Sequence, residues 1–223
     1  MIMFYEELVS QTSAAREYMM QAPVIRECVE GQISLDQYVA FLEQAYHHVK
    51  HTVPLLMACG SKLPQSYEWV REAIAEYIEE EKGHQYWILD DIACCGYDAK
   101  QVENGRPGRD IELMVSYLYH LIDRDNPMGF FGMVLVLEGT SVAIGGEMAK
   151  HVKENLNLSD NALTYLTSHC ELDQEHLQFF AGLMNKVESG EDQNAIIHSA
   201  NMIFHLYGDM LRTLSRGKDN GCV

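Results

Sequence analysis

Two groups of side chains in this sequence combine imidazole and carboxylate ligands at spacings that one helix face can present. Glu81 and His84 are three residues apart, and His169, Asp173 and His176 follow one another at intervals of four and three. Because residues three and four apart share a helix face, each group can direct its side chains at one ion. Glu81 with His84 alone also fits an exposed acidic surface, since it lies in a run of charged residues.

A further carboxylate, Glu138, interrupts a strongly apolar helical segment. A lone carboxylate there is costly to bury unless it is paired with a base or bound to a metal. An ion pair with a Lys or Arg of another helix is the alternative, although the chain has only 16 such residues. Together the three groups supply three histidines and three carboxylates.

Six ligands exceed the three that a catalytic zinc takes from a protein, and they suit a pair of iron or manganese ions in a helical bundle. The ferritin-like di-iron pattern of two E-x-x-H motifs is not met, because the chain has one. The six cysteines include no C-x-x-C pair, so a thiolate zinc site is not predicted.

Composition and charge argue against several classes of function. The chain has 223 residues and a formal charge of −17, which argues against a nucleic-acid or anionic-membrane surface. The first residues include acids rather than the basic region of a signal peptide, and the apolar stretch Pro127–Leu137 is too short to span a bilayer. We therefore expect a cytoplasmic protein with reduced thiols and no membrane or nucleic-acid partner.

Apolar residues recur at intervals of three and four along nearly the whole chain, which predicts an all-α protein. We expect one domain, residues 1–223, with residues 217–223 as a flexible tail. Ser34 with Gln37 forms a predicted capping box, Pro54 predicts a kink, and Asn126 is expected to cap a helix that starts at Pro127. The seven expected helices are Met3–Gln21, Ser34–Cys59, Ser66–Cys95, Asp110–Asp123, Asn126–Lys153, Ser159 or Asp160 to Glu188, and Glu191–Arg216.

The order of these motifs resembles the haem-oxygenase-like di-iron oxidases. An E-x-x-H motif, a glutamate inside an apolar helix and an H-x3-D-x2-H motif follow one another between Ser66 and Met184. The resemblance implies the seven-helix bundle shared with haem oxygenases, TenA thiaminases and the quinone synthase PqqC. It also implies that the metal ligands, and with them the catalytic residues, are Glu81, His84, Glu138, His169, Asp173 and His176.

The same resemblance implies two Fe(II) ions, with manganese as the alternative, and O2 as co-substrate. The expected reaction is oxidation of a small molecule of the amino-acid or fatty-acid type, by C–H abstraction or N-oxygenation, within secondary metabolism. The expected partners are that substrate, a second copy of the chain in a homodimer and, as an open alternative, an external electron donor.

Three alternatives have the same fold. A TenA-like thiamine-salvage hydrolase needs a nucleophilic cysteine on the helix that holds Glu138, and Pro127–Lys153 has none. A haem oxygenase needs a histidine on the first helix, and Met3–Gln21 has none. A PqqC-like cofactorless oxidase or a non-catalytic binding protein would not need six aligned ligands.

The substrate pocket is less well defined by the sequence. Candidates for its lining come from polar side chains of the second and last helices, and candidates for binding a substrate carboxylate are arginines. These residues are Tyr46, His47, His48, His51, His205, Tyr207 and Asp209, with Tyr117, Tyr119 and His120, and the arginines Arg16, Arg26, Arg124 and Arg212.

Overall fold

The computed structural model describes residues 3–215, apart from the side chains of residues 169–175. The described part is helical and contains no strand. Its long α-helices are α1 (Phe4–Gln11), α2 (Ser13–Met20), α3 (Pro23–Val29), α4 (Leu35–Val49), α5 (Thr52–Lys62), α6 (Glu68–Glu81), α7 (His84–Cys94), α9 (Arg109–Arg124), α10 (Phe131–Thr140), α11 (Gly146–Leu156), α12 (Thr164–Met184) and α13 (Gly190–Ser215), with the short α8 (Ala99–Glu103) and the turns η1 (Gln65–Tyr67), η2 (Pro127–Phe130), η3 (Ser141–Gly145) and η4 (Asp160–Ala162).

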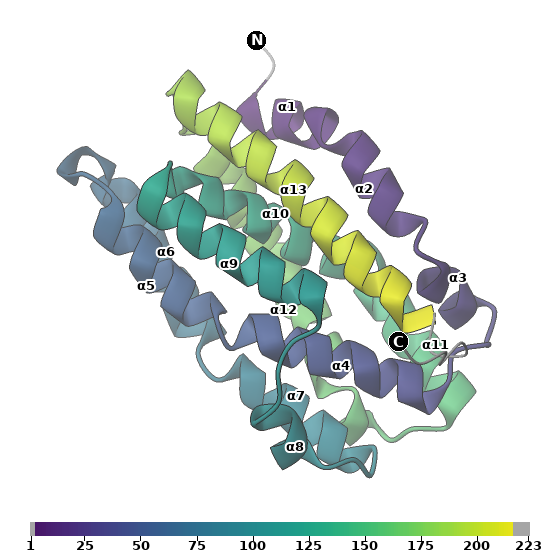
Figure 1. The fold of residues 1–223 in the computed structure, drawn as a ribbon. Helices are drawn as coiled ribbons and strands as arrows, with labels where there is room; N and C mark the ends of the chain where they lie inside the picture. Colours follow the sequence, from purple (N-terminus) through teal and green to yellow (C-terminus); the bar gives the residue numbers. More distant parts are fainter. Residues whose placement is uncertain (1–2, 216–223) are drawn as a thin grey trace.

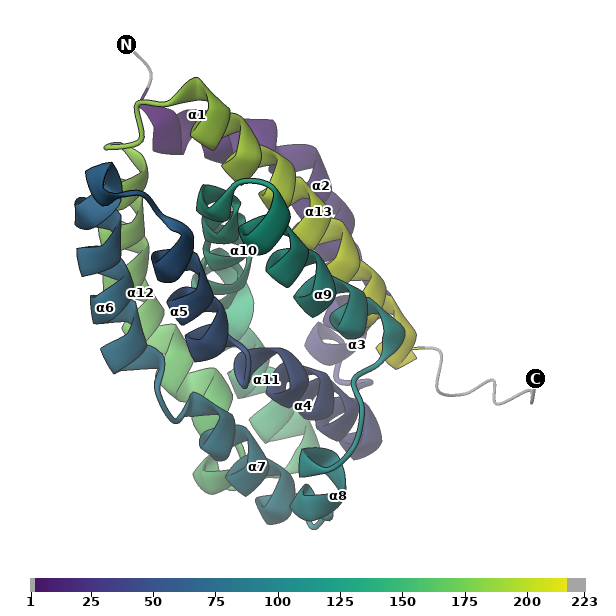
Figure 2. The same ribbon diagram turned by 60° about the vertical axis from the view of Figure 1, so that its left-hand side comes forward.

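The apolar helix α10 lies at the centre of the bundle. It packs against α13 and α12, while α13 also runs along α2 and α9 (Figures 1 and 2). Gly132 permits the close approach of α10 to α13, because a Cβ at that position would lie 2.5 Å from the backbone nitrogen of Ala200. Glu138, on the same helix, is buried.

All seven expected helical segments are present, but three are divided by breaks that the periodicity did not predict. The first is split at Thr12, and Pro23 begins α3 rather than only ending the preceding helix. The second breaks at Lys50 and His51, between α4 and α5. Pro54 explains this position, because a proline ring clashes with the carbonyl four residues earlier, here that of Lys50.

The third break separates the two residues of the E-x-x-H motif. Helix α6 begins at Glu68 rather than at the expected cap Ser66, and it ends at Glu81. Gly83 then takes a left-handed conformation, φ 96°, and α7 begins at His84. The premise that Glu81 and His84 share a face of one continuous helix is therefore wrong.

The segment from Pro127 to Leu156 forms one uninterrupted helical path with a π-helical turn, η3, directly after Glu138's own turn of α10. Its length and composition would suffice to cross a membrane, contrary to the expectation from Pro127–Leu137 alone, but 61% of its most apolar window is buried inside the protein. This is the environment of a core helix. Single π-turns inside α-helices are frequent at functional sites.

Helix α12 begins at Thr164, not at the expected caps Ser159 and Asp160, which instead flank and start the short turn η4. The carboxylate of Asp91, on α7, accepts hydrogen bonds from the backbone nitrogens of Thr164 at 3.0 Å and Tyr165 at 2.9 Å. A cap supplied from a distant helix cannot be found by local spacing.

Two further expectations about helix caps are confirmed. The capping box of Ser34 and Gln37 is present, and the Asn126 side chain accepts a hydrogen bond from the backbone nitrogen of Met128. The four described cysteines, Cys28, Cys59, Cys94 and Cys95, are free thiols. The expected tail, residues 217–223, lies outside the described residues.

We predict that Asp91→Ala lowers the free energy of unfolding by about 1–3 kcal/mol, because it removes a helix cap and leaves one buried and one partly buried N–H group unsatisfied. Asp91→Asn should cost less than half as much, since its amide oxygen still accepts and the buried charge, whose desolvation raises the pKa of Asp91, is gone. Urea unfolding measures both. Asp90→Ala, at the exposed neighbouring position, is the control, and an equal loss there would contradict the assignment.

The end of α4 buries a histidine beside a cation. His47 is 3% exposed, and its Nδ1 lies 3.1 Å from the ammonium group of Lys50, which also lies over the Tyr46 ring. Burial, followed by the charges of Lys50 and His51, lowers the pKa of His47 to about 4. The folded protein therefore binds fewer protons at this site than the unfolded chain does.

From this shift we predict an acid-sensitive stability. The contribution of His47 is intact above the unfolded pKa of about 6.5 and is lost as pH falls from there toward 4, at a cost on the order of 2 kcal/mol between pH 7 and pH 5. His47→Gln should flatten that part of the pH profile in urea titrations. His198→Gln, at an exposed position of α13, should leave it unchanged; identical profiles for the two variants would refute the prediction.

Candidate metal centre

Glu81, Glu138 and His176 converge from α6, α10 and α12 on one buried point. Each offers a ligand atom, and the three atoms lie within 4.8 Å of one another. Their residues are 9%, 8% and 6% exposed. Among the side chains that the structure describes, this is the only such group of three metal-ligating residues.

The donor set fits a metal ion. Two carboxylate oxygens and an imidazole nitrogen suit iron, manganese or zinc, and no thiolate is among them. Two carboxylates held this close in a buried site repel each other unless a positive charge lies nearby. A cation at this point would offset that repulsion, so the residues present match the metal that their spacing predicts.

His84 contacts Glu81, one member of this group, across the break between α6 and α7. Its Nδ1 lies 3.2 Å from Oε2 of Glu81, and its ring stacks on Trp87 with the ring centroids 4.1 Å apart. The two residues of the E-x-x-H motif therefore meet through the left-handed turn at Gly83 rather than through helical periodicity. The expectation of proximity holds, for a different structural reason.

The side chains of His169 and Asp173 lie outside the described residues. Helix α12 is continuous over both positions, seven and three residues before His176. Of the six predicted ligands, the structure thus brings together Glu81, Glu138 and His176, and His84 contacts Glu81. The places of the other two side chains stay predictions.

Two neighbours of the ligands were not identified from the sequence. Oε2 of Glu80 lies 3.0 Å from Nε2 of His176, although Glu80 belongs to a charge run that reads as solvated surface. The Tyr77 ring meets the His176 ring edge to face, with centroids 6.3 Å apart. The sequence does contain one indication that Tyr77 and Glu80 belong together. They are three residues apart, and this spacing places them on one face of α6.

The electrostatic surroundings keep the phenol of Tyr77 protonated. Burial raises its pKa above the usual range, and the carboxylates of Glu138, Glu80 and Glu81 raise it further. Tyr77 is therefore a neutral hydroxyl group beside the carboxylates at physiological pH.

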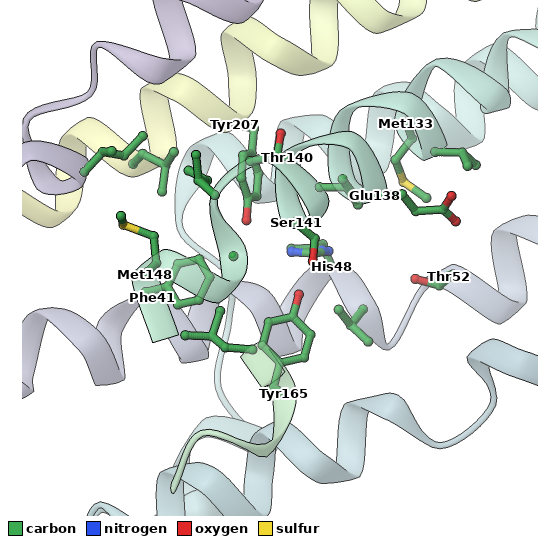
Figure 3. A pocket seen from close by; sticks show the side chains of 18 of the residues that line it. Phe41, His48, Thr52, Met133, Glu138, Thr140, Ser141, Met148, Tyr165 and Tyr207 are labelled. Atoms are coloured by element: carbon green, nitrogen blue, oxygen red, sulfur yellow. The ribbon is translucent and has the colours of Figure 1, made fainter. Parts of the chain in front are cut away.

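A cavity of about 170 Å³ extends from this group into the bundle (Figure 3). Tyr77, Glu81 and Glu138 line one end of it. Most of the remaining wall is apolar, and the π-turn η3 contributes Ser141, Ile144 and Gly145. A buried apolar cavity with a few convergent polar groups is the usual form of a small-molecule site.

Only some of the pocket residues proposed from the sequence line the cavity. His48 and Tyr207 line it, whereas His47 and His51 do not. None of the four candidate arginines lines it; Arg212, for example, packs over the Tyr18 ring at 3.8 Å and donates to the backbone oxygen of Gly208.

The fold is shared with several solved structures. A Shewanella denitrificans domain of unknown function with a haem-oxygenase-like fold superposes with a TM-score of 0.85 at 21% identity, covering 96% of this chain and 92% of its own. A TenA homologue from Pseudomonas syringae pv. tomato gives 0.78 at 11% identity (95% and 92%), and haem oxygenase-2 from Synechocystis, in complex with haem and NO, gives 0.76 at 13% (96% and 86%). These likenesses establish the fold.

No curated protein matches the sequence. A family model described as "Iron-containing redox enzyme" matches residues 39–208, a range that includes all six residues of the predicted ligand set. That match spans most of the chain, and we conclude that the protein belongs to the family of iron-containing redox enzymes.

Proposed function

We propose that this protein is a non-haem di-iron oxidase or oxygenase that activates O2 to oxidise a small molecule. The observation that carries the proposal is the convergence of Glu81, Glu138 and His176 at one end of an apolar cavity. Membership of an iron-containing redox family supports iron as the metal. The proposal accounts for why ionisable side chains are buried where the rest of the wall is apolar.

The ligands of the metal pair would be Glu81, His84, Glu138, His169, Asp173 and His176. The three carboxylates would carry three negative charges against the four positive charges of two ferrous ions. When bound, such a pair supplies electrons that reduce O2, so that a substrate C–H bond or amine nitrogen can be oxidised. The surrounding side chains would orient the ligands and exclude water.

Those side chains orient the ligands and exclude water. Glu80 holds Nε2 of His176, the kind of carboxylate–histidine contact that fixes the ring orientation and tautomer of a metal ligand. Tyr77 retains its proton and can donate a hydrogen bond or a proton to a group bound at this end of the cavity. The apolar wall keeps water from the reacting end.

The geometry does not favour a thiol hydrolase. Cys28 lines the cavity, but burial raises its pKa to about 11, so the thiolate that nucleophilic attack requires is scarce at neutral pH. A cofactorless oxidase or a non-catalytic binding protein remains distinguishable by iron binding, which neither needs.

We predict that the protein reconstituted anaerobically with Fe(II) binds two iron ions per chain and gains an O2-dependent absorbance. Glu138→Ala and His176→Ala should each lose at least one iron, and Asp173→Ala should lose one. Glu79→Ala, which removes a 74% exposed carboxylate from the same helix as Glu81, is the matched control and should bind two. Iron per chain near zero in the unaltered protein would refute the proposed function.

A separate prediction concerns Glu80. If its contact orients His176, Glu80→Ala should weaken iron affinity about 10- to 100-fold, the range found for carboxylates behind metal-ligating histidines, while saturating iron still fills both positions. Competition against a chelator measures the affinity. An affinity equal to that of Glu79→Ala would show that Glu80 is only a surface charge.

A further inference from the structure

The formal charges on the cavity wall are confined to one end. Glu81 and Glu138 are the charged side chains among the described lining residues, and no Lys or Arg is among them. The side chains of residues 169–175, outside the described part, include no Lys or Arg in the sequence either. Away from the metal end, the described wall therefore offers no Lys or Arg as the basic partner that a buried anion needs.

Charged substrates fit this wall poorly. A free amino acid brings both a carboxylate and an ammonium group, and a fatty acid brings a carboxylate whose usual partner is an arginine fork. With metal ions offsetting Glu81 and Glu138, the remaining wall offers no residual charge to a cation. An uncharged ligand avoids these desolvation costs.

Hydroxyl groups and an imidazole form a belt partway along the cavity. We define the polar belt as His48, Ser141, Tyr165 and Tyr207. In Figure 3 the hydroxyl groups of Tyr165 and Tyr207 turn toward the part of the cavity where His48 and Ser141 lie, and the His48 and Tyr207 rings meet at 5.8 Å between centroids. Hydroxyl and imidazole groups can both donate to and accept from an uncharged polar atom.

Beyond the polar belt the wall is apolar. Figure 3 shows Glu138 and Met133 on one side of the polar belt and Phe41 and Met148 on the other. Phe41 and Met148 mark this apolar end. The other apolar lining residues of α3, the loop before α4, α11, α12 and the last turns of α13 are Val24, Ile25, Cys28, Ile33, Val152, Leu166, Leu211 and Leu214. Such a wall suits a hydrocarbon chain.

We propose that the cavity binds an uncharged amphiphile, with a hydroxyl, amide or carbonyl group at the polar belt and its hydrocarbon chain among the apolar side chains of α3, α11 and α13. As an assignment of the substrate class, this inference rests on the proposed oxidase function. The binding itself depends only on the cavity, so the two can be tested apart. Of the two expected substrate types, the proposal keeps a hydrocarbon chain like that of a fatty acid and excludes free amino acids. It replaces the carboxylate of the fatty acid by an uncharged polar group.

Isothermal titration calorimetry under anaerobic conditions tests the proposal, with the Fe(II)-loaded and the metal-free protein. Octanamide and 1-octanol should bind at least about tenfold more tightly than octanoate in both forms, and than octylamine in the Fe(II)-loaded form. L-leucine should not bind. From six carbons upward, each methylene that enters the apolar end should raise the affinity about fourfold, which is about 0.8 kcal/mol per buried CH2. Tighter binding of octanoate or L-leucine, with or without iron, would overturn the proposal.

Two matched substitutions locate the binding. Met148→Trp fills the apolar end and should weaken 1-octanol binding at least about tenfold, whereas Met202→Trp, at an exposed position outside the cavity wall, should leave it unchanged. Ile25→Trp replaces Met148→Trp if circular dichroism shows that the latter does not fold. Equal affinities for cavity and control variants would overturn the proposal.

The two hypotheses fail separately. Neutral ligands that bind a protein unable to take up iron would leave the cavity assignment standing and remove the oxidase. If the protein binds two iron ions per chain but prefers octanoate, the cavity assignment is wrong and the proposed oxidase function still stands.

Discussion

Two carboxylates and an imidazole are buried within 4.8 Å of one another in an interior whose other walls are mainly apolar. Burying such charges costs several kcal/mol for each ion unless opposite charge and hydrogen bonds compensate for the lost hydration. His84 supplies part of that compensation through its contact with Glu81, and Glu80 contacts the imidazole of His176. A bound cation would supply the rest, and the surrounding helices hold these side chains together at this point.

The helices that carry the site are interrupted close to the side chains of the candidate metal ligands. Gly83 turns the chain between α6 and α7 so that His84 meets Glu81, and η3 widens the central helix just after Glu138. Asp91 fixes the start of α12, the helix that brings His176 to the site. These irregular features link local backbone geometry to the position of the metal ligands.

Helical periodicity and cap residues predicted much of the fold, because the seven segments depend on local signals such as the capping box at Ser34 and the start at Pro127. The ligand set could be proposed because the residue types and order are unusual for a core. Other features could not be predicted from local patterns. The break at Gly83 depends on a backbone conformation that has no periodic signature. The Asp91 cap and the contact of Glu80 with His176 each join segments that are distant in the sequence. The absence of arginine from the described cavity wall likewise emerges only when the helices are assembled.

The most direct test of the central claim is the location of iron in crystals of the Fe(II)-loaded protein, by anomalous diffraction measured on both sides of the iron absorption edge. The account predicts two iron peaks per chain, with at least one of them within coordination distance of Glu81, Glu138 and His176. Iron peaks elsewhere in a fully loaded protein, with these three side chains bound only to one another, would contradict it.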